Sequence, residues 1–341
     1  MKRLVIPRYG PPEVLEVREA PPPEIEAGQV RITVHHAGIN FSDLLARQGL
    51  YPDAPRPPCT TGYEVAGVID AVAPDVTTFR TGDRVVALTR HGGQSEVVAV
   101  GARSVFPLPE GWSSAEGAAL PVVYLTAHQM LVRVAAAQPG EVVLVHSAAG
   151  GVGLAVAELG KVLGLRVVGL ASAGKHDVLR SYGVEPLDRR DPHWPDAARR
   201  LAPKGFDVVL DSVGGRSFRR GYDLLAPAGR LVMYGASSLA AGERRNLART
   251  LWRLARFPWF HPLPLMNDNR GVLGVNLGHL WNEEAMLQPQ MQRLLQYARE
   301  KRIRPRVDRE FPLADAAAAH RYIQERRNVG KVVLTLGGAD S

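Results

Sequence analysis

The sequence predicts an α/β protein with two domains, one rich in β-strands and one built on a doubly wound parallel sheet. Length is the first reason, because 341 residues exceed what one hydrophobic core usually organises. The second is that, beyond residue 121, short β-rich runs give way to strands alternating with helix-length segments. We expect domains at residues 1–121 and 122–277, with residues 278–341 returning to the first domain.

The first third of the chain consists of β-branched runs separated by Gly, Pro and Asp, which predicts a mostly antiparallel β domain. The predicted strands are Val30–Val34, Gly67–Val72, Arg84–Leu88 and Glu96–Val100. Ser113 and Glu116 have the spacing of a capping box, which marks the start of a helix. The apolar stretch at residues 115–134 is expected to hold two helical segments, broken at Pro121.

From Glu141 onward strands and helices alternate, which is typical of βαβ units around a parallel sheet. The predicted strands are Val142–His146, Arg166–Leu170, Asp207–Asp211, Arg230–Tyr234 and Val272–Val275. Helices are expected at residues 284–301 and 313–326, and a last strand at residues 331–336. That last strand could close the sheet of the first domain, which would make the parallel-sheet domain an insertion.

A glycine-rich turn at residues 147–153 carries the strongest functional signal. Its sequence Ser-Ala-Ala-Gly-Gly-Val-Gly matches the dinucleotide fingerprint G-x-G-x-x-G, with Ala148 at the first glycine. Small residues are needed there, because the backbone must turn tightly and approach a pyrophosphate at a helix N-terminus. A plain strand-to-helix turn is the alternative. The strand before the turn and the helix after it favour a Rossmann domain, with Ala149, Gly150, Gly151 and Val152 binding the cofactor.

The end of the second strand of this domain favours NADPH over NADH. An NAD site normally has Asp or Glu there for the ribose hydroxyls, whereas this chain has Leu170-Ala171-Ser172-Ala173-Gly174-Lys175. Ser172 can hydrogen-bond a phosphate and Lys175 can oppose its charge, although a lysine at a helix start is often only solvated. Arg189 and Arg190, one strand further on, are additional candidates.

Motifs along nearly the whole chain resemble the medium-chain dehydrogenase/reductase family in its zinc-free quinone oxidoreductase branch. They include Ala37-Gly38-Ile39-Asn40-Phe41-Ser42-Asp43, Gly62-Tyr63-Glu64-Val65-Ala66-Gly67, Gly82-Asp83-Arg84-Val85 and Gly330-Lys331-Val332-Val333. Within that branch, residues 46–51, 172–176, 245–248 and 328–331 are similar to homologues of the synaptic vesicle membrane protein named for vesicular amine transport. The resemblance implies a GroES-like catalytic domain that holds a Rossmann domain, and homodimers joined through the edge strand near Val272–Val275.

The resemblance also implies that the protein works without a metal ion. Zinc-dependent members of the family have a ligating Cys where this chain has Asn40 and a ligating His where it has Tyr63. Quinones and α,β-unsaturated carbonyls suit a metal-free site, because hydride added to a conjugated carbon leaves charge delocalised onto oxygen. Asn40, Tyr51 and Tyr63 are the catalytic candidates, with a turn-stabilising amide and an ordinary loop anchor as the alternatives for Asn40 and Tyr51. Asp43 and Glu64 are expected to be structural.

Further cofactor contacts follow from the position of residues at the carboxyl ends of parallel strands, where ligands collect. Asn40 and Lys331 are included because they match motifs of the family. The remaining predicted cofactor-binding residues are Thr126, Ser212, Val213, Gly235, Ala236 and Asn276.

Residues 243–266 form a segment that is longer than a simple connection in a Rossmann domain needs. Leu247, Leu251 and Leu254 recur at helical spacing with arginines between them, and an aromatic, proline-broken stretch follows. A basic amphipathic helix with aromatics can contact an anionic membrane surface. A helix packed over the cleft or at the dimer interface is the interpretation we favour.

Composition and charge limit the remaining function classes. A chain that is 45% hydrophobic and 22% charged is ordinary for a globular protein, and the single Cys59 excludes an intramolecular disulfide. No apolar stretch has the length of a membrane span or a signal peptide, so we expect a soluble cytoplasmic protein. The net charge of +8 is concentrated at residues 243–256 and 293–309, so nucleic acid is not an expected partner.

Three functional hypotheses result. The first is an NADPH-dependent, zinc-independent reductase of a small-molecule quinone or enone. The second is a membrane-associated or regulatory nucleotide-binding module with little turnover. The third is an enoyl-thioester reductase.

Overall fold

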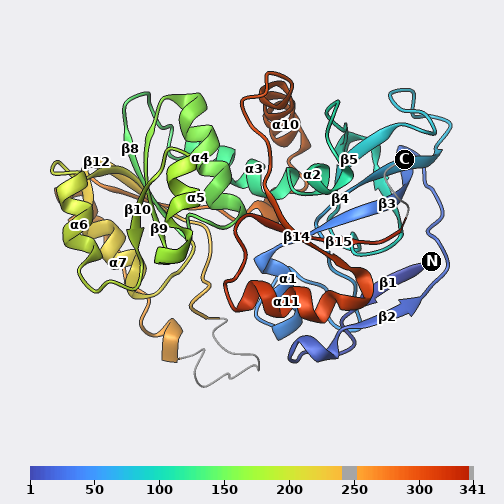
Figure 1. Ribbon diagram of the computed structural model, residues 1–341, viewed down its shortest axis with the longest axis horizontal. Helices are drawn as coiled ribbons and strands as arrows, with labels where there is room; N and C mark the ends of the chain where they lie inside the picture. Colours follow the sequence, from blue (N-terminus) through green and yellow to red (C-terminus); the bar gives the residue numbers. More distant parts are fainter. Residues whose placement is uncertain (240–251, 338–341) are drawn as a thin grey trace. The chain divides into compact units, whose positions relative to one another are not determined.

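The computed structural model describes residues 1–239 and 252–337, which divide into two compact units. Within these residues, unit 1 comprises 1–125 and 277–337, and unit 2 comprises 126–239 and 252–276. Unit 1 therefore contains both ends of the described chain, and unit 2 is inserted into it (Figure 1). The observed architecture is the expected α/β fold, with a mostly antiparallel β domain and a parallel-sheet domain.

Unit 1 is built on a seven-stranded sheet in the order β14-β15-β3-β4-β5-β7, with β6 paired to β3. Only the β14–β15 pair is parallel. The strands are β3 (Gln29–Ile39), β4 (Glu64–Val72), β5 (Arg84–Leu88), β6 (Val97–Gly101), β7 (Val105–Pro107), β14 (Val307–Pro312) and β15 (Lys331–Thr335). Strands β1 (Lys2–Val5) and β2 (Glu16–Glu19) form a separate two-stranded sheet.

The C-terminal strand β15 closes the sheet of unit 1, as the sequence predicted. It pairs antiparallel with one end of the long strand β3, where Val332 lies opposite Ile39. The other end of β3, Gln29–Thr33, pairs with β6. β3 thus joins the N-terminal and C-terminal parts of the chain in one core, which contains Val34, Leu44 and Leu334.

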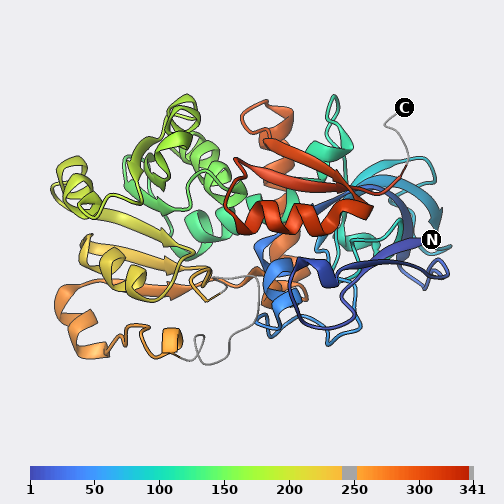
Figure 2. The same cartoon turned by 60° about the horizontal axis from the view of Figure 1, so that its bottom comes forward.

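Apart from α1, which the sequence analysis did not predict, the helices of unit 1 begin and end close to the predicted positions. They are α1 (Phe41–Gln48), α2 (Ser114–Ala118), α3 (Pro121–His128), α10 (Glu284–Arg299) and α11 (Ala316–Gln324). The predicted capping box is confirmed, because Ser113 caps α2 and the Glu116 carboxylate accepts the Ser113 N–H. Figures 1 and 2 show α11 alongside α1, although they are far apart in the sequence. α3 runs from unit 1 into unit 2 and continues as a π-helical turn at Gln129–Val134.

Unit 2 is built on a six-stranded sheet in the order β10-β9-β8-β11-β12-β13, and all its pairs are parallel. The strands are β8 (Val142–His146), β9 (Arg166–Ala171), β10 (Glu185–Asp188), β11 (Phe206–Asp211), β12 (Leu225–Met233) and β13 (Gly271–Gly274). Strand β10 was not among the predicted Val-rich runs, because it is short and contains Pro186. The order reverses between β8 and β11, which makes this the topological switch point of the sheet.

Helices cover both faces of the parallel sheet. These are α4 (Gly151–Leu163), α5 (His176–Ser181), α6 (Trp194–Leu201) and α7 (Arg216–Asp223), with α9 (Pro262–Asp268) before β13. α4 and α5 lie on one side of the strands, and α6 and α7 lie on the other (Figure 1). The core of this unit includes Leu144, Val168, Phe206 and Leu231. Within the described residues, no helix is long and apolar enough to cross a membrane.

Candidate active site

The glycine-rich turn of unit 2 has the geometry that a phosphate-binding turn needs. Strand β8 ends at His146, Gly150 is the N-cap of α4, and the helix begins at Gly151. A Cβ atom on Gly153 would lie 2.3 Å from the carbonyl oxygen of Ala148, so only glycine lets the helix start this close to the turn. The first N–H groups of a helix have no intrahelical acceptor, and they favour an anion. The turn therefore fits the diphosphate of a dinucleotide.

The structure places the predicted cofactor residues of unit 2 after all six parallel strands. Parallel strands end at the same edge of a sheet, so the loops that follow them share that edge. Ala149–Val152 follow β8; Ser172 and Lys175 follow β9; Arg189 and Arg190 follow β10; Ser212 and Val213 follow β11; Gly235 and Ala236 follow β12; and Asn276 follows β13. Thr126 lies in α3, at the start of unit 2.

Basic and hydroxyl side chains lie at the ends of β9 and β10. Ser172 is the N-cap residue of a short helical turn that contains Lys175, and both side chains are partly exposed. The Arg189 N–H donates to the carbonyl of Ala171 at 2.9 Å, which fixes the two strand ends side by side. The described residues at the end of β9 include no carboxylate that could bind ribose hydroxyls. This arrangement is suited to an anion more than to a pair of hydroxyl groups.

In unit 1, Asn40, Glu64 and Lys331 form a buried polar network. Asn40 Nδ2 donates to Glu64 Oε1 at 2.9 Å, and Lys331 Nζ donates to Asn40 Oδ1 at 2.5 Å. Lys331 Nζ also lies 2.5 Å from Glu64 Oε1, and these two side chains are 4% and 0% exposed. The other carboxylate oxygen of Glu64 accepts the Val122 N–H at the start of α3. Lys331 was predicted to bind cofactor, and in the structure its ammonium group binds Asn40 and Glu64.

Gly38 leaves the space that this network occupies. A Cβ atom at that position would lie 2.5 Å from Glu64 Oε1 and 2.6 Å from the Ala118 carbonyl oxygen. Any other residue there would push the carboxylate away from Asn40. The absence of a side chain at Gly38 is therefore a requirement for the contact between Glu64 and Asn40.

Asp43 holds the two loops that carry Asn40 and Tyr63. Its carboxylate accepts the N–H of Asn40 at 2.8 Å and the N–H of Gly62 at 3.1 Å. Burial raises the pKa of Asp43 to about 6, although the hydrogen bonds and the positive charge of Lys331 oppose that shift. Asp43 and Glu64 are thus both engaged in holding the loops around the network.

Tyr51 and Tyr63, the other two catalytic candidates, lie against each other in unit 1. Their rings meet edge to face with centroids 6.2 Å apart, and Tyr63 makes a similar contact with His91. Burial, reinforced by Asp53, raises the pKa of Tyr51 to about 12. Burial also raises the pKa of Tyr63 far above its ordinary value. Both phenols therefore keep their protons at neutral pH and can only donate or accept hydrogen bonds.

Sequence reasoning did not select His91, His146, Asp211 or Ser217 as site residues. His91 joins the tyrosine cluster, and the other three contact one another in unit 2. His146 and Asp211 each end a predicted strand, so position alone could have indicated them. Ser217 lies inside a helix and gives no sequence signal.

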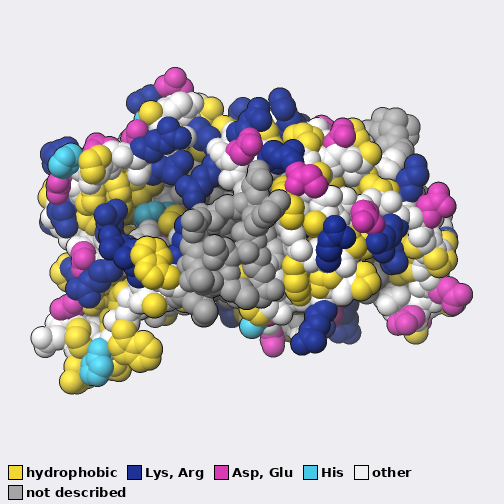
Figure 3. Space-filling view, turned by 90° about the horizontal axis from the view of Figure 1, so that it is seen from below, with side chains coloured by type: hydrophobic (Ala, Val, Ile, Leu, Met, Phe, Trp, Pro, Cys, Tyr) yellow, Lys and Arg dark blue, Asp and Glu magenta, His cyan; other side chains and the backbone are white. Residues whose placement is uncertain are grey.

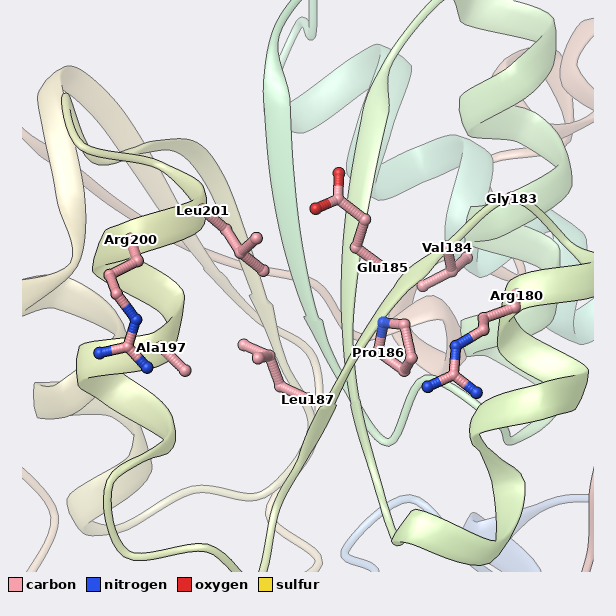
Figure 4. A pocket seen from close by; sticks show the side chains of 9 residues that line it. All are labelled: Arg180, Gly183, Val184, Glu185, Pro186, Leu187, Ala197, Arg200 and Leu201. Carbon is pink, nitrogen blue, oxygen red and sulfur yellow. The ribbon is translucent and has the colours of Figure 1, made fainter.

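A separate hollow in unit 2 contains none of the predicted site residues. It opens beside the edge strand β10, between α5 and α6, with a volume of about 590 Å³. Figure 4 shows Leu187 and Leu201 facing each other across it, with Arg180 and Arg200 on opposite sides. In the described part of the chain, no three His, Cys, Asp or Glu side chains are grouped so that they could hold a metal ion.

Comparison with known proteins gives the family. Residues 26–135 match the family described as alcohol dehydrogenase GroES-like domain, and residues 184–334 match zinc-binding dehydrogenase. The chain is also 41% identical to the synaptic vesicle membrane protein VAT-1 homolog of Danio rerio, over 98% of this chain and 70% of that protein. The chain belongs to the medium-chain dehydrogenase/reductase family. It is therefore an oxidoreductase by family, and the resemblance found in the sequence is confirmed.

Two solved structures extend this comparison to the whole fold. The quinone oxidoreductase from Thermus thermophilus, determined alone and with NADPH, is 37% identical with a TM-score of 0.82, covering 98% of this chain and 100% of that one. The CurK enoyl reductase is 28% identical with a TM-score of 0.86, covering 98% and 99% of the two chains. The similarity to the first of these structures supports a nicotinamide cofactor for this family member.

Proposed function

We propose that the protein is an NADPH-dependent, zinc-independent reductase of quinones or α,β-unsaturated carbonyl compounds. The glycine-rich turn between β8 and α4, with Gly153 packed against the Ala148 carbonyl, is the observation that carries this proposal. The similarity to a quinone oxidoreductase with a structure in complex with NADPH supports it. Ser172, Lys175, Arg189 and Arg190 would bind the additional phosphate that distinguishes NADPH from NADH.

The chemistry needs few catalytic side chains. When bound, the cofactor supplies a hydride to the conjugated carbon of the substrate, and the resulting negative charge is delocalised onto the substrate oxygen. Asn40 uses one of its two Nδ2 hydrogens for Glu64, so the other can donate to the cofactor ribose or the substrate. Tyr51, which keeps its proton at neutral pH and hydrogen-bonds the Asp53 carboxylate, is the candidate donor to the substrate oxygen: it would turn that hydrogen bond to the substrate, with solvent completing proton delivery.

Asn40 and Tyr63 stand where zinc-dependent relatives have metal ligands. The Asn40 amide is engaged with Glu64 and Lys331, and a protonated phenol is a poor ligand for zinc. We therefore propose activity without zinc. Elemental analysis of the purified protein should find zinc well below one equivalent, and one equivalent of bound zinc would overturn this part of the proposal.

The test of the reductase activity follows NADPH oxidation by absorbance with a quinone, an enal, an enoyl thioester and a simple ketone. We expect turnover with the quinone or the enal, little with the ketone, and a slower reaction in Asn40→Ala. Preference for the thioester would support the alternative that the protein is an enoyl-thioester reductase. The similarity to the CurK enoyl reductase favours that alternative. Tight NADPH binding with no turnover on any substrate would instead support a regulatory module.

A second candidate activity is contact with an anionic membrane surface through residues 243–266, of which the structure describes 252–266. Phe257 and Phe260 pack against the core of unit 2. In contrast, Trp259 is 88% exposed, Leu263 66% and Met266 72%. Figure 3 shows hydrophobic side chains gathered around a histidine at the lower left of that view. Arg253 and Arg256 supply positive charge in the same segment.

Liposome flotation tests this second activity. Wild type should float with vesicles that contain phosphatidylglycerol and not with neutral ones, and Trp259→Ser/Leu263→Ser should remain at the bottom of the gradient. Val17→Ser, which changes an exposed apolar residue of unit 1, is the matched control. Equal flotation of all three proteins would show that this segment does not contact the membrane.

We also propose a homodimer joined through β13. This strand ends the parallel sheet and pairs on one side with β12. Its outer edge can accept a strand from a second copy. Light scattering should give twice the chain mass, and Leu273→Pro, which places a ring in that strand, should give the monomer mass.

A further inference from the structure

The carboxylate of Asp211 is buried at the switch point of the parallel sheet. Asp211 is the last residue of β11 and is 0% exposed. Its Oδ1 accepts the N–H of Val213 at 2.6 Å and the N–H of Gly214 at 3.2 Å. Its Oδ2 accepts the hydroxyl of Ser217 at 2.5 Å. Three donors from the six residues after β11 therefore converge on one side chain.

The loop that these bonds hold has an unusual backbone. Gly214 and Gly215 have φ angles of +81° and +64°, in the left-handed region that favours glycine. The ring of Phe257 closes over Gly214, since a Cβ there would lie 2.9 Å from Phe257 Cζ. Two consecutive positive φ angles do not fix a loop by themselves, because glycine adopts many other conformations at similar cost. The hydrogen bonds to Asp211 select this one.

The same loop joins its neighbours on both sides. The Ser212 hydroxyl donates to the hydroxyl oxygen of Ser147, in the glycine-rich turn after β8, at 3.1 Å. The N–H groups of Ser237 and Ser238, after β12, donate to the carbonyls of Ser212 and Val213 at 3.0 and 2.9 Å. The loops after β8, β11 and β12, all predicted to contact cofactor, thus form one continuous structure.

A neutral imidazole lies beside the carboxylate. His146, the last residue of β8, has Nδ1 3.4 Å from Ser217 Oγ and Nε2 3.7 Å from Asp211 Oδ2. Burial lowers the pKa of His146, and the charge of Arg220 adds to that effect, although Asp211 opposes it. Because His146 stays neutral, the N–H and O–H donors of the loop are what stabilise the Asp211 carboxylate. The carboxylate and the loop therefore depend on each other.

We propose that Asp211 is a positioning residue for the dinucleotide. It holds residues 212–217 in the conformation that aligns the loops after β8, β11 and β12, and so pre-forms the surface on which the cofactor lies. This inference rests on the proposed function, because it assigns a role within the same cofactor site. Asp211 acts through the loop and has no contact with cofactor of its own.

Asp207 provides a matched control at the other end of the same strand. Its Oδ2 accepts the Val142 N–H at 2.8 Å, so it too links β11 to β8, but at the amino edge of the sheet. Asp207→Asn and Asp211→Asn make the same chemical change, and Ser217→Ala removes one donor while it keeps the carboxylate. NADPH affinity is measured by fluorescence titration, and hydrogen exchange is measured at Val213 and Gly214.

We expect Asp211→Asn to weaken NADPH binding about tenfold or more and Ser217→Ala about threefold, as for lost hydrogen bonds to a charged group. The KM for NADPH should rise while kcat changes little, since the reacting atoms are untouched. The amides of Val213 and Gly214 should exchange faster in Asp211→Asn. Asp207→Asn should leave the affinity and both amides unchanged.

Two results would overturn the inference, and they differ from a failure of the proposed function. One is an equal loss of affinity in Asp207→Asn and Asp211→Asn, which would mean that both act only through stability. The other is wild-type affinity in both Asp211→Asn and Ser217→Ala. If wild type itself binds neither NADPH nor NADH, the proposed function fails, and this inference fails with it. If Asp211→Asn does not fold, the affinity and amide exchange of Ser217→Ala decide the question.

Discussion

The two units assemble their candidate sites in different ways. In unit 2 the glycine-rich turn is seven consecutive residues, and its shape comes from the backbone and from the absence of side chains. In unit 1 the polar network joins Asn40, Glu64 and Lys331 from three separate strand ends, and its shape comes from side-chain hydrogen bonds. A site of the first kind is sensitive to added atoms, whereas a site of the second kind is sensitive to a lost partner. Substitutions can separate these two behaviours.

The largest expected effect is in the unit 1 network. Lys331→Met leaves the Glu64 carboxylate buried without its cation, so the free energy of unfolding of unit 1 should fall by about 3–5 kcal/mol. Denaturant-dependent hydrogen exchange of the β3 amides measures this. Glu64→Gln/Lys331→Met should recover most of the loss. Lys204→Met, at an exposed lysine, should cost less than about 0.5 kcal/mol.

A buried histidine without hydrogen-bond partners should make the stability of unit 1 sensitive to acid. His320 is fully buried in α11, and neither ring nitrogen has a hydrogen-bond partner among the residues described. Burial, together with the charge of Arg47, lowers the pKa of His320 from 6.5 to about 3. The unfolded chain therefore binds a proton more readily. The stability from the neutral histidine is complete above pH 6.5 and is lost as pH falls toward 3.

This loss should amount to about 4 kcal/mol between pH 6.5 and pH 3. His320→Leu should remove it, which urea unfolding across that range would show as a flatter pH dependence. His193→Leu, at an exposed histidine of unit 2, is the control. An unchanged pH profile in His320→Leu would contradict the prediction.

In unit 2 a side-chain atom added to the glycine-rich turn should lower both stability and cofactor affinity. Gly153→Ala places a methyl group against the Ala148 carbonyl, so we expect about 2 kcal/mol of lost stability and an NADPH affinity reduced more than tenfold. Titration calorimetry measures the affinity. Gly101→Ala, where a Cβ meets nothing within 4 Å, should bind like wild type. Normal binding by Gly153→Ala would show that the turn tolerates side chains.

The smallest effect should come from a charge at the edge of the cofactor site. Lys175→Ala should weaken NADPH binding about tenfold, or about 1.4 kcal/mol, and leave NADH binding unchanged. The ratio of the two KM values is the measurement. A wild-type preference for NADH of more than about tenfold would reverse the cofactor assignment altogether.

How far the sequence predicts a feature depends on how local its cause is. Strands β8, β9 and β11 were predicted within a residue or two, because buried parallel strands are Val-rich runs. Strand β10 is partly exposed and contains Pro186, and it was not recognised. The glycine-rich turn was found because its constraint lies within one turn of chain.

By itself the sequence determined the α/β class, the return of the C-terminal strand and the position of the glycine-rich turn, since periodicity and small residues act over short distances. Tertiary structure decided what the side chains do. Lys331 faces Asn40 and Glu64 because β15 pairs with β3 in one register, and a shift of one residue would turn it to the other face. His146 and Asp211 meet because β8 and β11 are neighbours in the sheet although 65 residues separate them. Such contacts depend on strand order and register, which no short segment of sequence specifies.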